Sequence, residues 1–351
     1  MNKSELQEEV YQIVLKEKEL LEIDMLLDEL QDKYNSIEDP DFLDLVTVYA
    51  QELPRSLRIY LNNFRMKELA GGICVISGFS IGSLPHTPSH WKDKQYPSLT
   101  IREDIFFTLC ASLLGDFIGW ATQQDGYILH DVLPIKGHEK DQIGSGSEVL
   151  LTWHTEDAFH PYRTDYLGLM CLKNPDDVET TYAKIDDIKV SDHYKSILFQ
   201  NRFAIKPDES HLKKNRLNSI RDLGVSKSFL ESIYDRNEKM NVNPEKTAVL
   251  FGHPDSPYLR LDPYYMDLED EDNEAMEALH SIIQNIEGAM KSLVLKPGDI
   301  AFIDNYKVVH GRKPFKARYD GNDRWLKRLN ITRDLRKSRD SRVAANNRIL
   351  F

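Results

Sequence analysis

The sequence predicts a mainly β fold with flanking helices, in which two sheets form a barrel or jelly roll. Short apolar segments of strand length recur in its second half, and Pro, Gly and Asp residues typical of turns separate them. The clearest of these segments are YLRLD, LVLKPGDIAFIDN, KVVHG and LKRLNITRDL. Only a few helical stretches lie among them. A chain of 351 residues can hold such a fold in one elaborated domain.

The first 70 residues predict a helical extension packed on this core. Residues 4–35 place apolar side chains at helical spacing among charged ones. Pro54 begins a further helix, and a Gly-Gly pair ends it before the strand-like run ICVISGF. The apolar run IREDIFFTLCASLLGDFIGW then predicts a long helix buried against a sheet. We therefore expect an extension over residues 1–70 and the β domain over residues 71–351.

Two polar stretches interrupt the strand pattern and predict segments that close over a site. Residues 136–148, KGHEKDQIGSGSE, are rich in Gly and Ser and lie between two strand-like runs. Residues 207–246 are polar and lack strand alternation, which predicts an inserted helical lid. We expect both stretches to become ordered when a substrate binds, because a closed site excludes water.

Composition disfavours several classes of function. Apolar residues make up 41% of the chain, and no run approaches the roughly 20 apolar residues that span a bilayer. The opening MNKSELQEEVYQ lacks the features of a signal peptide, so we expect a cytoplasmic protein. A net charge of −12 disfavours nucleic acid as a partner. Widely spaced cysteines predict neither disulfides nor a thiolate zinc site, and they are Cys74, Cys110 and Cys171.

The segment LLTWHTEDAFHPY contains the first two candidate metal ligands. If LLTW is a strand, its alternation places His154 and Glu156 on one face, with Thr155 pointing away. A histidine and a carboxylate two positions apart are common by chance, and they more often form a polar pair at the end of a strand. Alone, this pair does not establish a metal site.

His310 is the third candidate ligand, and it follows a strand-like run at the rim of a sheet. Two histidines and one carboxylate can occupy one face of an octahedron around Fe(II), which leaves three positions for an oxidant and a cosubstrate. A zinc or manganese hydrolase could use the same three residue types. The ligands alone therefore do not identify the metal.

Two arginines follow His310 in the sequence. Arg324 lies fourteen residues after it and Arg328 four residues further on, so one strand would place both guanidinium groups on the same face. Each guanidinium can bind a carboxylate through two hydrogen bonds. Beside a set of metal ligands, the two arginines favour recognition of carboxylates over a solvated basic strand.

With these motifs the chain resembles the clavaminate synthase-like Fe(II)/2-oxoglutarate-dependent oxygenases, especially those that hydroxylate free basic amino acids. The resemblance covers most of residues 70–340 and rests on WHTEDAFHPYRTDYLGLMCL and VVHGRKPFKARYDGNDRWLKR. It implies a distorted double-stranded β-helix, or cupin-like jelly roll, that uses Fe(II), 2-oxoglutarate and O2. Because Glu156 supplies a carboxylate ligand, halide has no vacant position at the metal, and hydroxylation is favoured over halogenation.

The resemblance also implies roles for individual residues. Arg324 matches the arginine that binds the distal carboxylate of 2-oxoglutarate, and Arg328 matches the one that holds the α-carboxylate of the amino acid. Thr181 matches a threonine that helps to hold the cosubstrate, although an adjacent threonine leaves the register open by one residue. Gln123 or Gln124 falls where related enzymes place an amide near the substrate amine.

The acidic segment FGHPDSPYLRLDPYYMDLEDED bears on the substrate. Asp262 is the best candidate to bind a cationic head group, with Tyr264 nearby, although an acidic turn after a strand explains it equally well. One acid and a phenol suit an ammonium better than the two acids that a planar guanidinium favours. The sequence therefore favours free L-lysine over L-arginine, with hydroxylation at C4 by resemblance.

Three alternatives stay open at this point. The chain could hydroxylate L-arginine within the same family, it could be a hydrolase that uses the same three metal ligands, or it could be a non-catalytic binding protein. In the first two cases the partner is a small molecule, and neither nucleic acid nor a membrane is expected. A homo-oligomer is compatible with the sequence.

Overall fold

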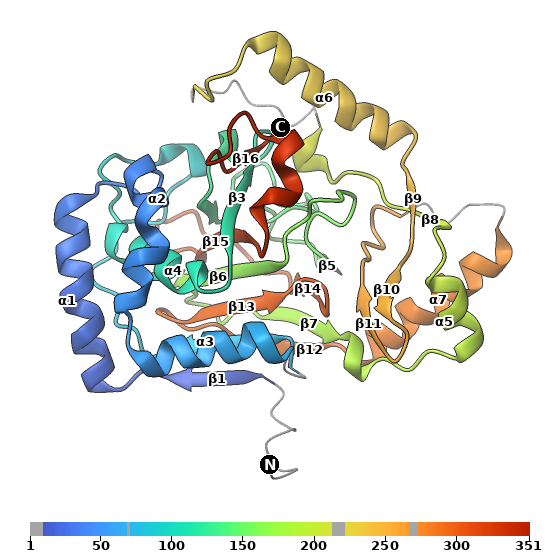
Figure 1. Ribbon diagram of the computed structural model, residues 1–351, viewed down its shortest axis with the longest axis horizontal. Helices are drawn as coiled ribbons and strands as arrows, with labels where there is room; N and C mark the ends of the chain where they lie inside the picture. Colours follow the sequence, from blue (N-terminus) through green and yellow to red (C-terminus); the bar gives the residue numbers. More distant parts are fainter. Residues whose placement is uncertain (1–9, 69–70, 213–221, 267–271) are drawn as a thin grey trace.

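The computed structural model describes residues 10–68, 71–212, 222–266 and 272–351, and two β-sheets form its centre (Figure 1). The larger sheet has the strand order β1-β2-β13-β6-β15-β3-β16, and β4 also pairs with β15. The smaller sheet has the order β12-β7-β14-β5. Helices gather around both sheets, as expected for a mainly β fold with flanking helices.

The strands and helices have the following bounds. The larger sheet consists of β1 (Tyr11–Val14), β2 (Ile73–Ser77), β3 (Asp116–Trp120), β4 (His130–Val132), β6 (Tyr166–Lys173), β13 (Ile300–Asp304), β15 (Trp325–Thr332) and β16 (Ile349–Leu350). The smaller sheet consists of β5 (Leu151–His154), β7 (Thr180–Lys184), β12 (Lys291–Leu293) and β14 (Val308–Arg312). Two separate pairs are β8 (Phe203–Ala204) with β9 (Lys246–Thr247), and β10 (Leu250–His253) with β11 (Ser256–Leu259). The helices are α1 (Glu17–Lys33), α2 (Pro40–Tyr49), α3 (Arg55–Lys67), α4 (Ile101–Ser112), α5 (Asp192–Leu198), α6 (Lys227–Val242) and α7 (Asn273–Gly288).

The inner faces of the two sheets share one hydrophobic cluster. It joins Val75 and Ile303 of the larger sheet to Tyr182 and Val308 of the smaller one. Because successive residues of a strand point to opposite faces, the other apolar side chains point to the outer faces of the sheets, where further elements must pack on them. This explains why β6 and β13 are buried along almost their whole length.

Helices α1 to α4 cover the outer face of the larger sheet (Figure 1). One cluster runs from these helices through the sheet, so the extension and the β domain share a core. The prediction of helices over residues 4–35 is wrong for β1, which extends the larger sheet parallel to β2. Tyr11 and Ile13 on this strand pack against the same cluster, and these alternate positions suit a sheet edge.

The predicted long helix after residue 100 is shorter than expected. Helix α4 ends at Ser112, and the following residues form strand β3 between β15 and β16. Gly115 makes this turn possible, since a Cβ at this position would lie 2.2 Å from the carbonyl oxygen of Thr332. A helix through this point would collide with β15.

Helices α5 and α7 cover the outer face of the smaller sheet on the opposite side of the molecule (Figure 1). The predicted insertion over residues 207–246 contains α6, which contacts the end of the chain through the tilted rings of Phe229 and Phe351. Residues 213–221 of this insertion lie outside the described residues. Its closure over a site stays a prediction. In the described part of the chain, no helix is long and apolar enough to cross a bilayer.

A buried ion cluster joins α4, β4 and β15 beneath the larger sheet. The ammonium of Lys327 lies 2.7 Å from Asp131 and 3.4 Å from Asp104, and all three side chains are buried. The indole of Trp325 donates a further hydrogen bond to Asp131. Burial opposes ionisation of Asp131, but Lys327 and Lys94 lower its pKa to about 2. The cluster thereby holds β4 in place against β15.

Replacing Lys327 by Met should lower the free energy of unfolding by about 3–5 kcal/mol, because Asp104 would stay buried without a counter-charge and Asp131 would keep only Lys94, at 3.5 Å. Urea unfolding followed by circular dichroism measures the loss. Arg102→Met is the control, since its pairs with Asp24 and Asp28 are more exposed and should contribute less than about 1 kcal/mol. Equal losses in the two variants would contradict the role given to the buried cluster.

Candidate active site

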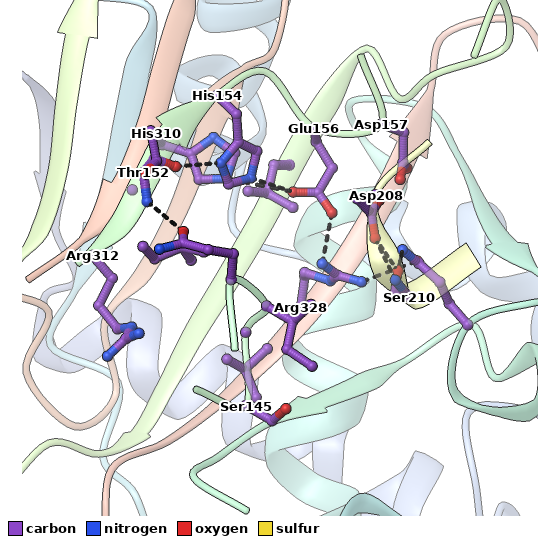
Figure 2. A pocket seen from close by; sticks show the side chains of 18 of the residues that line it. Ser145, Thr152, His154, Glu156, Asp157, Asp208, Ser210, His310, Arg312 and Arg328 are labelled. Atoms are coloured by element: carbon purple, nitrogen blue, oxygen red, sulfur yellow. Dashed lines mark hydrogen bonds and ion pairs between the residues drawn. The ribbon is translucent and has the colours of Figure 1, made fainter. Parts of the chain in front are cut away.

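A cavity of about 460 Å³ opens at the inner faces of the two sheets (Figure 2). Strands β5 and β14 supply one wall, and strands β6 and β15 supply the opposite one. The loop over residues 136–148 and the start of the predicted lid complete the rim. The cavity thus lies where both polar stretches were expected to close over a site.

The three predicted metal ligands come together at one wall of this cavity (Figure 2). Antiparallel pairing of β14 with β5 sets His310 directly opposite His154. The Nε2 atoms of His154 and His310 lie 3.8 and 3.4 Å from the same carboxylate oxygen of Glu156. Two imidazoles and one carboxylate converge on a common point, which is a donor set suited to Fe(II).

Neighbouring groups orient these ligands. Nδ1 of His154 lies 2.7 Å from the carbonyl oxygen of Thr152, so Nδ1 carries the hydrogen and Nε2 is free to bind a metal. The side chain of Asn305 accepts a hydrogen bond from the backbone N–H of Glu156 and donates one to its carbonyl. This buried amide, which sequence reasoning did not single out, fixes the chain just beyond β5.

The charges of the cluster favour a cation at its centre. Burial opposes a charged His154, but Glu156 and Asp262 outweigh burial and raise its pKa to about 9. Burial likewise opposes ionisation of Glu156, yet Arg328 and the two histidines hold its pKa well below the usual range. The carboxylate of Glu156 and the two imidazoles therefore fit a divalent ion.

Arg328 lies beside the ligand set and points toward Glu156 (Figure 2). Its Nη1 atom is 2.6 Å from Oε1 of that carboxylate. Its Nη2 atom lies 2.7 Å from Nδ1 of His130 and 3.2 Å from the side-chain oxygen of Gln123. Nε of Arg328 is buried without a hydrogen-bond partner. A donor therefore remains for an incoming carboxylate.

Arg324 lines the cavity from the same face of its strand region as Arg328, in agreement with the predicted alternation. Burial lowers its pKa to about 10, and its Nε has no hydrogen-bond partner. Arg312, which sequence reasoning missed, also lines the cavity and donates to the carbonyls of Ser147 and Val149. Its position two residues after His310 on β14 is the signal that could have found it.

Thr180 lines the cavity, whereas Thr181 does not. Strand β7 pairs with β14 so that Thr180 lies opposite Arg312 and Thr181 lies opposite Gly311. Residues paired in this way point to the same face, so Thr181 points away from Arg312. The role of Thr181 stays a prediction, but the pairing and the lining favour Thr180, because two adjacent threonines leave the face undecided until the pairing is known.

The two predicted glutamines both line the cavity but differ in their bonding. The amide of Gln124 is occupied by the backbone of Asp131, since it donates to the carbonyl and accepts from the N–H. Gln123 donates to the hydroxyl of Ser210 and accepts from Arg328. Both amides are therefore hydrogen-bonded within the protein, and the role of either glutamine toward a substrate amine stays a prediction.

Two carboxylates line the cavity without an arginine or lysine partner among the described residues. Asp262 is buried, and its pKa is raised to about 6, first by burial and then by the charge of Asp208. Asp208 accepts hydrogen bonds from the backbone and hydroxyl of Ser210. Tyr264 is also in the lining, as predicted. Asp208 was not predicted, and its only signal is an acid two residues before a serine at the start of the predicted lid.

The start of this insertion is anchored beside the metal ligands. His211 lies 3.2 Å from a carboxylate oxygen of Asp157, the residue after Glu156. The other oxygen of Asp157 accepts a hydrogen bond of 2.6 Å from the indole of Trp120. Both oxygens of Asp157 are therefore used by protein donors, and the pair with His211 secures Asp208 and its neighbours at the rim.

Comparisons with known proteins identify the family of the chain. Residues 210–330 match the family described as taurine catabolism dioxygenase TauD, TfdA family. The chain is 49% identical over 342 residues to an enduracididine beta-hydroxylase of Streptomyces hygroscopicus, which covers 96% of this chain and 98% of that protein. It is 45% identical to an L-ornithine/L-arginine 3-hydroxylase of Catenulispora acidiphila, over 97% of this chain and 100% of that protein.

More distant relatives and a solved structure complete the comparison. An L-lysine 4-hydroxylase of Chitinophaga pinensis is 26% identical, over 87% of this chain and 76% of that protein. The crystal structure of the non-haem iron oxygenase OrfP with Fe, succinate and (3S)-hydroxy-L-Arg superposes with a TM-score of 0.89. It is 39% identical and covers 97% of this chain and 99% of that one.

Substituting either histidine of the ligand set by Ala should weaken Fe(II) or Co(II) binding by at least about 100-fold, because two donors cannot hold the ion as three do. Anaerobic calorimetric titration of His154→Ala and His310→Ala measures this. His253→Ala serves as the control, since that histidine is exposed on a hairpin away from the cavity. Metal binding as tight as in the control would refute the assignment of the ligand.

Proposed function

The chain belongs to the TauD/TfdA family of Fe(II)/2-oxoglutarate-dependent oxygenases, and we propose that it hydroxylates free L-arginine at C3. It is an amino-acid hydroxylase that uses Fe(II), 2-oxoglutarate and O2 and acts on a free basic amino acid. We assign its two facing sheets to a distorted double-stranded β-helix. The observation that carries the choice of arginine is the much higher identity to the arginine and enduracididine hydroxylases than to the lysine hydroxylases.

In this proposal His154, Glu156 and His310 hold the iron. The bound iron, with O2 and 2-oxoglutarate, supplies the oxidation that replaces a C–H bond by C–OH and releases succinate and CO2. The protein contributes position and exclusion of water. Burial of Glu156 and His310 keeps the ligands out of bulk solvent, and the hydrogen bond from His154 to a backbone carbonyl keeps its ring oriented.

We assign the distal carboxylate of 2-oxoglutarate to Arg324. This buried guanidinium has an unpartnered Nε and lines the same cavity as the metal ligands, so a carboxylate would supply the counter-charge that it lacks. Thr180 replaces Thr181 as the hydroxyl of this subsite, since it lines the cavity. A hydrolase would have no use for this second anion site, which argues against the hydrolase alternative.

Arg328 is assigned to the α-carboxylate of the substrate, and its position bears on the carbon that reacts. Because its Nη1 lies 2.6 Å from Glu156, a carboxylate on Arg328 would sit beside the metal. The carbons nearest to the metal would then be those next to the carboxylate, which favours C3 over C4. The relatives named as beta-hydroxylase and as 3-hydroxylase refer to this same carbon. C3 therefore replaces the C4 expected from the sequence.

The charges of the cavity suit a basic amino acid. L-Arginine carries one negative group and two positive ones, and the cavity offers Arg328 together with Asp208 and Asp262. Gln123 and Ser210 add polar atoms for the α-ammonium. The preference for lysine rested on a single acid at the head group. With Asp208 as a second acid, that reason no longer distinguishes an ammonium from a guanidinium.

A substrate panel tests the proposal. The Fe(II) enzyme with 2-oxoglutarate and O2 should form the most succinate, and a product with one added oxygen, from L-arginine. Nuclear magnetic resonance should locate the hydroxyl at C3. L-Citrulline, the uncharged analogue, should react at least about tenfold less efficiently, because it leaves buried carboxylates without a partner.

The controls for this panel are L-lysine, L-ornithine and two aspartate variants. Asp262→Asn should reduce kcat/KM for L-arginine by about 100-fold and bring it closer to kcat/KM for L-citrulline. Asp255→Asn, at an exposed position, should leave kcat/KM for both amino acids unchanged. Faster turnover of L-lysine would reject arginine as the substrate. If no amino acid stimulates succinate formation, amino-acid hydroxylation itself is rejected.

Arg324→Ala and Arg328→Ala should each raise KM for a different ligand, so the two variants serve as controls for each other. The first should raise KM for 2-oxoglutarate and the second should raise KM for the amino acid. Each loses a charged pair worth about 2–5 kcal/mol. Steady-state kinetics with each ligand varied in turn measures the two KM values of each variant. A reversed pattern would exchange the two assignments.

A further inference from the structure

We infer that His130 is a positioning residue that fixes the guanidinium of Arg328 for the α-carboxylate of the substrate. This inference rests on the proposed function of Arg328. No sequence motif pointed to His130, which lies within the strand-like run GYILHDVLP. The structure places its imidazole directly against the arginine that borders the metal ligands.

Strand pairing sets the contact between the two side chains. In the antiparallel pair β4 and β15, His130 lies opposite Arg328, and paired residues point to the same face of the sheet. Nδ1 of His130 is 2.7 Å from Nη2 of Arg328, and the histidine is only 1% exposed. The contact is therefore shielded from water and short.

The chemistry of the pair determines the form of the histidine. A guanidinium only donates hydrogen bonds, so Nδ1 of His130 accepts and the ring is neutral, with its hydrogen on Nε2. Burial, followed by the charge of Arg328, lowers the pKa of His130 well below its ordinary value, in agreement with this form. Gln123 supplies a second uncharged acceptor to the same Nη2 atom.

A neutral acceptor orients Arg328 without cancelling its charge. A carboxylate at position 130 would form an ion pair with the guanidinium and compete with the carboxylate of the substrate. With Nη2 held by His130 and Gln123, the buried and unpartnered Nε remains as a donor for the substrate. Without the histidine, Arg328 could turn further toward Glu156, which it already contacts through Nη1.

The main chain of His130 is itself held in place from the opposite face. Its neighbour Asp131 pairs with Lys327 and accepts from Trp325, and the amide of Gln124 binds both backbone groups of Asp131. The three-residue strand β4 thus has an ionic anchor on one face and the contact with Arg328 on the other. A strand so short needs both to keep the imidazole at a defined distance.

Three variants at position 130 test the inference. His130→Leu removes the acceptor and should raise KM for the amino acid by about tenfold, while KM for 2-oxoglutarate stays within about twofold. It should also increase the share of 2-oxoglutarate consumed without hydroxylation. His130→Asn places an amide oxygen near the position of Nδ1 and should restore most of the loss. His130→Asp adds a competing charge and should bind the amino acid no better than His130→Leu.

Two controls separate positioning from a merely structural role. Leu329 lies on the same strand and is fully buried in the cluster on the outer face of the sheet. Leu329→Ala should lower the melting temperature without raising KM for the amino acid selectively. In an Arg328→Ala background, His130→Leu should change KM for the amino acid by less than about twofold, because the residue acts through Arg328.

The outcomes that would overturn the inference differ from those that concern the substrate. Unchanged KM and coupling in His130→Leu, no rescue by His130→Asn, or an undiminished effect in the Arg328→Ala background would each reject it. If the wild-type enzyme prefers another amino acid, the choice of L-arginine fails, and the same variants are measured with the preferred amino acid. Loss of binding of the amino acid to the anaerobic Fe(II) and 2-oxoglutarate complex should follow the same order among the variants.

Discussion

The pairing of β14 with β5 is the constraint on which the site depends. It sets His310 opposite His154 at the inner face of the smaller sheet, and it leaves Glu156 just beyond the end of β5. A slip of one residue would send the imidazole of His310 to the outer face, where α5 and α7 pack. The hydrophobic cluster between the sheets and the amide of Asn305 both resist such a slip. The arrangement of the three candidate ligands is thus a consequence of sheet register.

The cavity keeps charges without partners, and the structure around it provides compensation. Arg324 and Asp262 are buried and lack ion-pair partners among the described residues, which is unfavourable until ligands of opposite charge arrive. Immediately beneath, on the other face of β15, Lys327 and its two acids are fully paired. Alternation along one strand separates these two environments. The paired face stabilises the strand whose other face remains free to bind ligands.

Period-two alternation explains what could be predicted from the sequence, and its limits explain the rest. The approach of His154 to His310 follows from short motifs on strands, so the residues could be named before their pairing was known. The sequence alone does not decide between Thr180 and Thr181, because adjacent threonines lie on opposite faces and only the partner strand selects one. His130 and Asp208 were missed because their significance comes from residues far away in sequence, which no local pattern reports. The sequence predicts helix where β1 forms, because a short edge strand takes its pairing from β2.

Orientation of the substrate follows from an asymmetry in how its two ends are held. The α-carboxylate would meet Arg328, which is held on three sides by Glu156, His130 and Gln123 and has little freedom. The head group would meet Asp262, near residues of the insertion that begins at residue 207. An anchor held by three neighbours beside the metal ligands would keep the same carbon in place for side chains of different length. On this argument Arg328 determines which carbon reacts, and the acids that meet the other end of the substrate determine which amino acid binds.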